Sequence, residues 1–184
     1  MASYLEEVQK GMDLLASDPR SIFVGQAMEY KGHAISRQVN KYSGQLLEVP
    51  VMEDTQAGIC LGLAMEGYVP INCYPRCNFS ILACNQLINH IDKWKTLTGQ
   101  DVKIITKMVV GSTANLDPGC QHKANYAEAF KHMCEFIPVY DLTKSSKAFS
   151  VLTDDGFCKH ISQVYNSVFN RTESCVIVED ANLY

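Results

Sequence analysis

The chain has 184 residues, of which 47% are hydrophobic and 20% are charged, and its formal net charge is −4. This length and composition predict a globular protein with one core and exclude a disordered acidic segment. Lysine and arginine form no run, so neither a nucleic acid nor an anionic membrane is expected as a partner. No apolar stretch reaches the roughly 18 residues that a membrane helix needs. Because no repeat and no Pro/Gly/Ser-rich linker occurs, we expect one domain over residues 1–184.

The eight cysteines suggest neither a zinc site nor a disulfide framework. Only Cys73 and Cys77 are closely spaced, and no second pair follows them. Most of the others lie in apolar runs, where a free cysteine packs as a small hydrophobic residue. The N-terminal residues also lack the basic and apolar segments of a secretory signal. We therefore expect reduced thiols, no metal bound by this chain alone, and a cytoplasmic location.

Short apolar runs rich in β-branched residues alternate with segments of helical periodicity along the chain. In chain order we predict helix 3–16, strand 21–25, helix 34–41, strand 46–50, helix 53–65, strand 68–74, helix 79–97, strand 102–110, helix 123–133, strand 136–141, helix 156–169 and strand 175–179. The strands lack period-two alternation, which is typical of strands buried on both faces. The pattern predicts an α/β fold: a doubly wound, mostly parallel sheet with helices on both faces.

Three of these helices carry additional signals. Ser3, followed three residues later by Glu6, is typical of a capping box at the first helix. Helix 79–97 has its larger apolar residues on one face at a spacing of 3.6 residues, which predicts an amphipathic helix lying on the sheet. Gly58 and Gly62 lie four residues apart in helix 53–65, and each costs roughly 0.5–1 kcal/mol relative to alanine. Either another chain packs closely against this helix, or its own sheet does.

Candidate functional residues lie where strands pass into helices, because open α/β sheets bind ligands beyond the carboxyl ends of their strands. The glycine-rich phosphate-binding motifs are absent. Glu53 follows strand 46–50, where a carboxylate is either a helix cap or a catalytic group. Phe79 follows strand 68–74 and, taken alone, reads as a core residue. His122 closes the long segment 111–122 after strand 102–110, and is either structural or functional.

The ordered set of these residues resembles a known family. It is similar to the pyrimidine-binding domain of transketolase-type thiamine diphosphate enzymes, and most similar to the beta subunit of the pyruvate and branched-chain 2-oxo acid dehydrogenase decarboxylases. The resemblance runs from about residue 5 to residue 181. It is carried by residues 36–37, 49–53, 57–59, 62, 64–65, 67, 70, 78–80, 85–89 and 121–122.

The resemblance implies a role at each junction. Glu53, with Met52 beside it, would bind the aminopyrimidine of the cofactor at N1′, so that N4′ can remove the thiazolium C2 proton. A carboxyl group in a low-dielectric site can share a proton with such a weakly basic nitrogen. Phe79 would stack on the pyrimidine. His122 would face the substrate and could donate or accept a proton there.

Two departures from the family pattern limit the resemblance. Arg76 stands where many relatives have a second aromatic residue; it is either solvated or salt-bridged, or it binds a substrate carboxylate or phosphate. The Gly-Asp-Gly…Asn signature for Mg²⁺ is absent, and Asp154-Asp155-Gly156 does not match it. The C-terminal domain of full-length relatives is also expected to be absent, because the sequence stops at Tyr184.

The sequence therefore predicts half of an active site, in a homo- or hetero-oligomer. A separate alpha-like subunit would bind the diphosphate and supply Mg²⁺. The reaction would be decarboxylation of a 2-oxo acid or transfer of a two-carbon unit from a ketose, a choice that the sequence leaves open. Two alternatives also stay open: a non-catalytic assembly or regulatory subunit that keeps the fold, and a piece of a larger enzyme.

Overall fold

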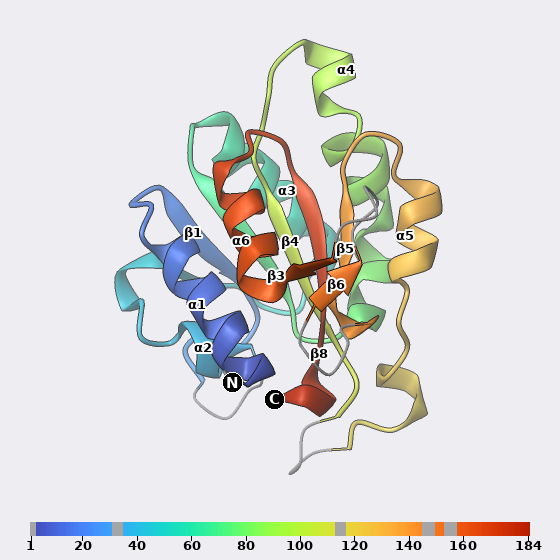
Figure 1. Cartoon of the computed structure of the whole chain (residues 1–184). Coiled ribbons are helices and arrows are strands. Elements are labelled where there is room, and N and C mark those ends of the chain that lie inside the picture. The colour runs from blue at the N-terminus through green and yellow to red at the C-terminus, as the bar shows by residue number, and fades with distance from the viewer. Residues whose placement is uncertain (1–2, 31–34, 113–116, 145–149, 153–157) are drawn as a thin grey trace.

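The computed structural model describes residues 3–30, 35–112, 117–144, 150–152 and 158–184. Six strands form one sheet in the spatial order β2-β1-β3-β4-β8-β5, and every neighbouring pair is parallel (Figure 1). Their bounds are β1 (Ser21–Gly25), β2 (Leu46–Glu48), β3 (Val69–Tyr74), β4 (Ile105–Val110), β5 (Val139–Asp141) and β8 (Cys175–Asp180). The chain winds outward from β1 in both directions, which confirms the predicted doubly wound α/β fold.

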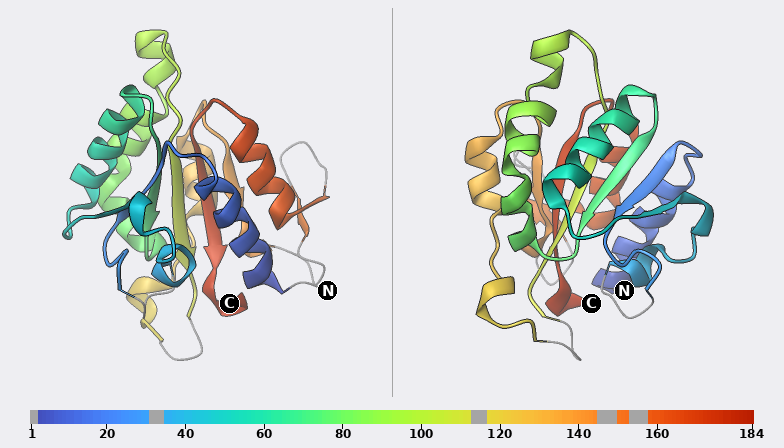
Figure 2. Two further views of the ribbon diagram at one scale, coloured as in Figure 1. Left: turned by 90° about the vertical axis from the view of Figure 1, so that its left-hand side faces the viewer. Right: turned by 180° about the vertical axis from the view of Figure 1, so that it is seen from behind.

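Helices cover both faces of this sheet, as Figure 2 shows from two sides. One face carries α1 (Tyr4–Ala16), α2 (Ser36–Val39) and α6 (Ile161–Asn170), which bury a core against β1, β3, β4 and β8. The other face carries α3 (Glu53–Met65), the helical segment 77–98 and α5 (Ala127–Met133). Burial of the sheet from both sides explains why its strands lack alternating polarity.

The starts of helices α1 and α3 match the sequence prediction to within one residue. Ser3 and Glu6 form the predicted capping box: the Ser3 hydroxyl accepts from the Glu6 amide at 3.2 Å, and the Glu6 carboxylate accepts from the Ser3 amide at 2.6 Å. Helix α3 begins at Glu53 and ends at Met65, as predicted. No helix in the described ranges is long and apolar enough to cross a membrane.

The predicted continuous helix 79–97 is wrong. The segment consists of the 3₁₀ turns η2 (Cys77–Ala83), the π-helical η3 (Asn85–Ile91) and α4 (Trp94–Thr98). Leu87 and Ile91 are buried as expected, but Leu82 faces solvent. In a 3₁₀ turn residues three apart eclipse each other, so Leu82 follows the half-exposed Phe79 instead of joining the buried face.

Several boundaries also differ from the prediction. Strand β2 ends two residues early, β4 and β5 each begin three residues late, and α5 begins four residues late. A short antiparallel hairpin, β6 (Ser150–Leu152) with β7 (Cys158–His160), was not predicted and occupies part of the expected helix 156–169. Residue 34 of predicted helix 34–41, residues 156–157 of helix 156–169, and the Asp154-Asp155-Gly156 sequence lie outside the described residues.

The glycines of α3 point away from the sheet. A Cβ atom at Gly62 would meet no atom within 4 Å, and one at Gly58 would meet only the Gln86 side chain at 4.0 Å. The buried residues of α3 are Glu53, Gln56, Ala57, Cys60, Leu61 and Ala64. Close packing by its own sheet therefore does not account for Gly58 and Gly62.

Candidate active site

The three junctions with candidate residues lie at the carboxyl edge of the sheet. Glu53 follows β2, Arg76 and Phe79 follow β3, and the segment that His122 closes follows β4. These strands are parallel within the order β2-β1-β3-β4, so the segments that follow them leave the same edge of the sheet. Helix α3 contacts η2, and η2 contacts the 3₁₀ turn η4 (Cys120–His122). Four predicted site residues therefore come from adjoining segments, and we call Glu53, Arg76, Phe79 and His122 the carboxyl-edge site.

Glu53 is the first residue of α3 and is only 5% exposed. One carboxylate oxygen accepts a hydrogen bond from Gln26 Nε2 at 3.1 Å. Within the described ranges this neutral amide is the one hydrogen-bond donor to that carboxylate. Met52, the residue before the helix, is half-buried and makes no side-chain cap. A buried carboxylate with an unused oxygen can accept a further donor, which a fully capped one could not.

A buried polar chain that sequence reasoning missed lies beneath Glu53. Gln56 Nε2 donates to Asn72 Oδ1 at 2.7 Å, and Asn72 Nδ2 donates to the Tyr74 hydroxyl at 3.2 Å. The Tyr74 hydroxyl then donates to the backbone carbonyl of Glu53 at 3.0 Å, and burial raises the pKa of this tyrosine. These hydrogen bonds connect the first turn of α3 to β3. An asparagine inside the apolar run of β3 was the available signal, because buried polar groups need partners.

The structure brings Phe79 and His122 into contact. Their ring centroids lie 5.2 Å apart with an interplanar angle of 65°, an edge-to-face contact. His122 Nδ1 is enclosed and has no hydrogen-bond partner among the described residues, and the same holds for the enclosed Asn78 Oδ1. Asn78 Nδ2 donates to the Tyr126 hydroxyl at 3.3 Å. Enclosed polar atoms without partners are rare in folded proteins and indicate a place where a ligand can bind.

Arg76 is buried to 6% exposure at the end of β3. Its Nη1 donates to the carbonyl of Gly111 at 2.6 Å, and burial lowers the pKa of the guanidinium. No carboxylate in the part of the chain that the structure describes forms an ion pair with it. The prediction of a solvated or salt-bridged arginine is therefore wrong for the described residues, whereas binding of a substrate anion stays open.

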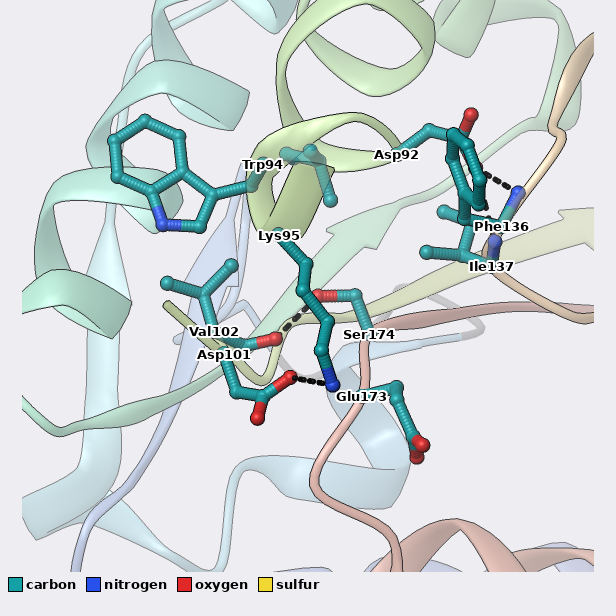
Figure 3. A pocket seen from close by; sticks show the side chains of 10 residues that line it. Asp92, Trp94, Lys95, Asp101, Val102, Phe136, Ile137, Glu173 and Ser174 are labelled. Carbon is teal, nitrogen blue, oxygen red and sulfur yellow. Dashed lines mark hydrogen bonds and ion pairs between the residues drawn. The ribbon is translucent and has the colours of Figure 1, made fainter. Parts of the chain in front are cut away.

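A separate small pocket lies at the opposite edge of the sheet, where β4, β5 and β8 begin (Figure 3). Its volume is about 70 Å³, and Trp94, Lys95 and Phe136 are among the residues that line it. The buried Asp92 on its wall accepts hydrogen bonds from the amides of residues 135–137 at 2.9–3.0 Å. This pocket is smaller than typical ligand sites and lies away from the edge at which α/β sheets bind ligands.

The fold places the chain in a class of proteins. Among solved structures it is similar to a split-gene transketolase, described as an inactive beta4 tetramer, with a TM-score of 0.63 over 96% of this chain and 51% of that one. Sequence identity is 10%, so this likeness shows the fold alone. The chain therefore shares the α/β fold of that structure. No family model matches it.

Curated relatives then identify the family more closely. The chain is 31% identical over 134 residues to the mitochondrial pyruvate dehydrogenase E1 component subunit beta of Bos taurus, and equally to that of Homo sapiens. It is 24% identical over 122 residues to the 3-methyl-2-oxobutanoate dehydrogenase subunit beta of Mycobacterium tuberculosis. These matches cover 69% and 64% of this chain but 37% and 35% of the relatives, so the chain spans about a third of their length. The relatives confirm the resemblance to 2-oxo acid dehydrogenase beta subunits.

Proposed function

We propose that this chain, as one domain, is the pyrimidine-binding half of a thiamine diphosphate-dependent active site. A separate alpha-like subunit would bind the diphosphate and supply Mg²⁺. The single observation that carries the proposal is the arrangement at the carboxyl edge: a buried carboxylate with spare acceptor capacity, and an aromatic ring packed against a histidine with an unpaired nitrogen. Relationship to beta subunits of 2-oxo acid dehydrogenases supports it.

The side chains present fit a flat heteroaromatic ring that both donates and accepts hydrogen bonds. Glu53 can hold a proton at N1′ of an aminopyrimidine, because its carboxylate has one neutral donor among the described residues. Phe79, half-buried and locked against His122, presents a face for stacking, and Met52 lies beside Glu53. When bound, thiamine diphosphate supplies a carbon nucleophile for a 2-oxo acid or ketose carbonyl. His122 Nδ1, free of protein partners, can donate or accept a proton at the substrate.

Exposed apolar side chains flank this site and support an association with another subunit. Val51 precedes Glu53 and is 77% exposed, while Ile81 and Leu82 follow Phe79 and are 51% and 64% exposed. Clustered exposed apolar residues mark interaction surfaces more often than scattered ones do. A subunit that covers them would also enclose the cofactor, which would strengthen every electrostatic contact in the site.

The second candidate is a non-catalytic subunit that retains the fold for assembly or regulation. The outward-facing glycines of α3 favour it, because they offer another chain a close approach to the helix backbone. Both candidates predict an oligomer. They differ in whether Glu53 moves a proton.

Substitution of Glu53 separates the two candidates. In the complex with the diphosphate-binding subunit and Mg²⁺, we expect Glu53→Gln to keep the fold but to slow C2 hydrogen–deuterium exchange of the bound cofactor by about 10² to 10⁴. Glu66→Gln, an exposed position at the other end of α3, is the matched control and should exchange at the wild-type rate. Wild-type exchange in Glu53→Gln would leave Glu53 a helix-start carboxylate and favour the assembly subunit.

Calorimetry on the chain alone tests the shared nature of the site. We expect weak or no binding of thiamine diphosphate until the partner subunit and Mg²⁺ are added, because the diphosphate-binding signature is absent from this sequence. Tight binding by the isolated chain would contradict a divided site. A cytoplasmic location stays a prediction, to be checked by imaging the tagged full-length protein.

A further inference from the structure

Arg76 is a buried cation whose charge the described residues do not balance. Charged side chains are almost never fully buried unless they are paired, because loss of hydration is costly. The guanidinium has five N–H donors in a planar fork, and one of them is used, by the carbonyl of Gly111 at 2.6 Å. A neutral carbonyl does not offset a full positive charge. The remaining donors have no acceptor in the described ranges, so they are available to a ligand.

Lys107, a fully buried cation among the described residues, shows that this fold can balance such a charge. Lys107 in β4 lies 2.5 Å from the Glu179 carboxylate and 2.8 Å from Gln38 Oε1. Each donor–acceptor pair there is internal to the chain. The contrast indicates that Arg76 lacks a carboxylate because its counter-charge comes from outside the described residues.

The position of Arg76 ties it to the candidate site. Its backbone carbonyl accepts from the Phe79 amide at 3.1 Å, and its guanidinium binds the residue that opens the segment 111–122. His122 closes the same segment and packs against Phe79. Arg76 therefore contacts Gly111, and Phe79 contacts His122, at the first and last residues of the segment 111–122.

The geometry points to Arg76 as the residue that binds an oxyanion carried by the substrate, and we propose that it selects an anionic substrate over a neutral one. That the bound anion is a substrate rests on the proposed function. That Arg76 binds an anion does not depend on it. A planar guanidinium binds a carboxylate or a phosphate through two parallel hydrogen bonds, and the two groups share this chemistry. Low exposure makes the attraction stronger than at a free surface.

Anion binding is first tested on the full-length chain, alone and in the complex. Malonate represents a carboxylate and inorganic phosphate represents a phosphate, each at ionic strength held constant with chloride. Calorimetry gives the affinity of the wild type and of each variant, and the Nε–Hε resonance of Arg76 in the wild type shows whether the anion contacts this side chain. We expect a saturable shift with at least one probe, and an affinity at least tenfold weaker in Arg76→Met. Arg20→Met, which removes an arginine paired with Asp18, is the matched control and should bind like the wild type. The probe that binds more tightly assigns the carboxylate or the phosphate.

Substrate selection is then tested in the complex. For two 2-oxo acids that differ only in a second anionic group, we expect Arg76→Met to raise KM for the more anionic acid by about ten- to a hundredfold and to leave kcat nearly unchanged, with partial rescue by Arg76→Lys. No response of the Arg76 resonance to either probe would overturn the proposal. The proposal would also be overturned if Arg76→Met left the ratio of the KM values of the two acids unchanged but weakened subunit association. The guanidinium would then pair with the partner subunit instead of the substrate. A complex that binds anions through Arg76 but turns over no substrate would refute the proposed function alone.

Discussion

Two buried polar regions of this chain handle charge in opposite ways. In the first, which we call the paired cluster, Lys107 lies 2.5 Å from Glu179, and Gln38 accepts from the lysine at 2.8 Å. Tyr184 donates to the same Glu179 at 2.5 Å, and Tyr165 donates to its other oxygen. In the carboxyl-edge site, by contrast, each buried charge has one neutral partner among the described residues.

The difference separates a structural role from a functional one. Buried charges whose hydrogen-bonding capacity is filled from within the chain stabilise a particular packing and have nothing left to offer a ligand. Buried charges with unused capacity cost stability, and proteins retain them mainly at sites that bind or react. Glu53 and Arg76 are of the second kind, while Lys107 and Glu179 are of the first. Substitutions in the paired cluster should therefore mainly lower the stability of the fold. Substitutions in the carboxyl-edge site should mainly lower ligand binding or activity.

The largest effect on folding is expected in the paired cluster. Lys107→Met leaves Glu179 buried without its cation, and should lower the free energy of unfolding by about 3–5 kcal/mol in urea titrations. The double variant Lys107→Met/Glu179→Leu removes both charges and should recover most of that loss. If the single variant loses less than about 1 kcal/mol, the pair is not the stabilising element that its geometry indicates.

A smaller effect is expected at Asp92 on the edge opposite the candidate site. Burial opposes its ionisation, but amide donors from residues 135–137 and Lys93 outweigh burial and lower the pKa of the carboxyl. A lowered pKa gives stability that is present above the unfolded value of about 4 and is lost as the pH falls through the folded value. We expect Asp92→Asn to cost about 2–3 kcal/mol at pH 7 and to flatten the loss of stability below pH 4. Unchanged acid dependence would show that other carboxyl groups control it.

In helix α3, one substitution is expected to stabilise the folded chain but to weaken its assembly with another subunit. In the isolated chain a Cβ atom at Gly62 meets no atom within 4 Å, and replacing a helical glycine should raise the free energy of unfolding by up to about 1 kcal/mol. In the assembly the same side chain should weaken association by roughly 1–3 kcal/mol through overpacking. Gly44→Leu, also in open space but outside α3, is the control. Wild-type association of Gly62→Leu, measured by analytical ultracentrifugation, would place the interface elsewhere.

The sequence predicted the fold well because its signals are local. The capping box located the start of α1, the predicted bounds of α3 match those observed, and buried apolar runs located the strands of the parallel sheet. The failures occurred where tertiary contacts decide the backbone. The apolar pattern of residues 79–97 fits an α-helix, yet η2 and η3 wind more tightly and more loosely than one, and only packing against α3 and the sheet selects that conformation.

The site was predicted less completely. The junction rule and the family resemblance pointed to Glu53, Phe79 and His122, and the structure brings the segments that carry them together. The pairings that set their chemistry join residues far apart in sequence, such as Gln26 with Glu53 and Arg76 with Gly111. A single sequence contains no measure of such distances, so the burial of Arg76 and the polar chain from Gln56 to Tyr74 could not be derived from it.

The smallest expected change in stability is at Arg76. It allows a direct comparison between the two buried cations, Arg76 and Lys107. Lys107→Met and Arg76→Met remove the same charge from buried positions, but the first leaves a carboxylate unpaired and the second leaves only the carbonyl of Gly111. Removal of an unbalanced buried cation relieves its desolvation cost, whereas the lost hydrogen bond costs about 1 kcal/mol. We therefore expect Arg76→Met to change the free energy of unfolding by less than about 1 kcal/mol in urea titrations, even though anion binding is lost. A loss comparable to that of Lys107→Met would show that Arg76 is balanced within the folded chain, and the distinction between the two buried cations would fail.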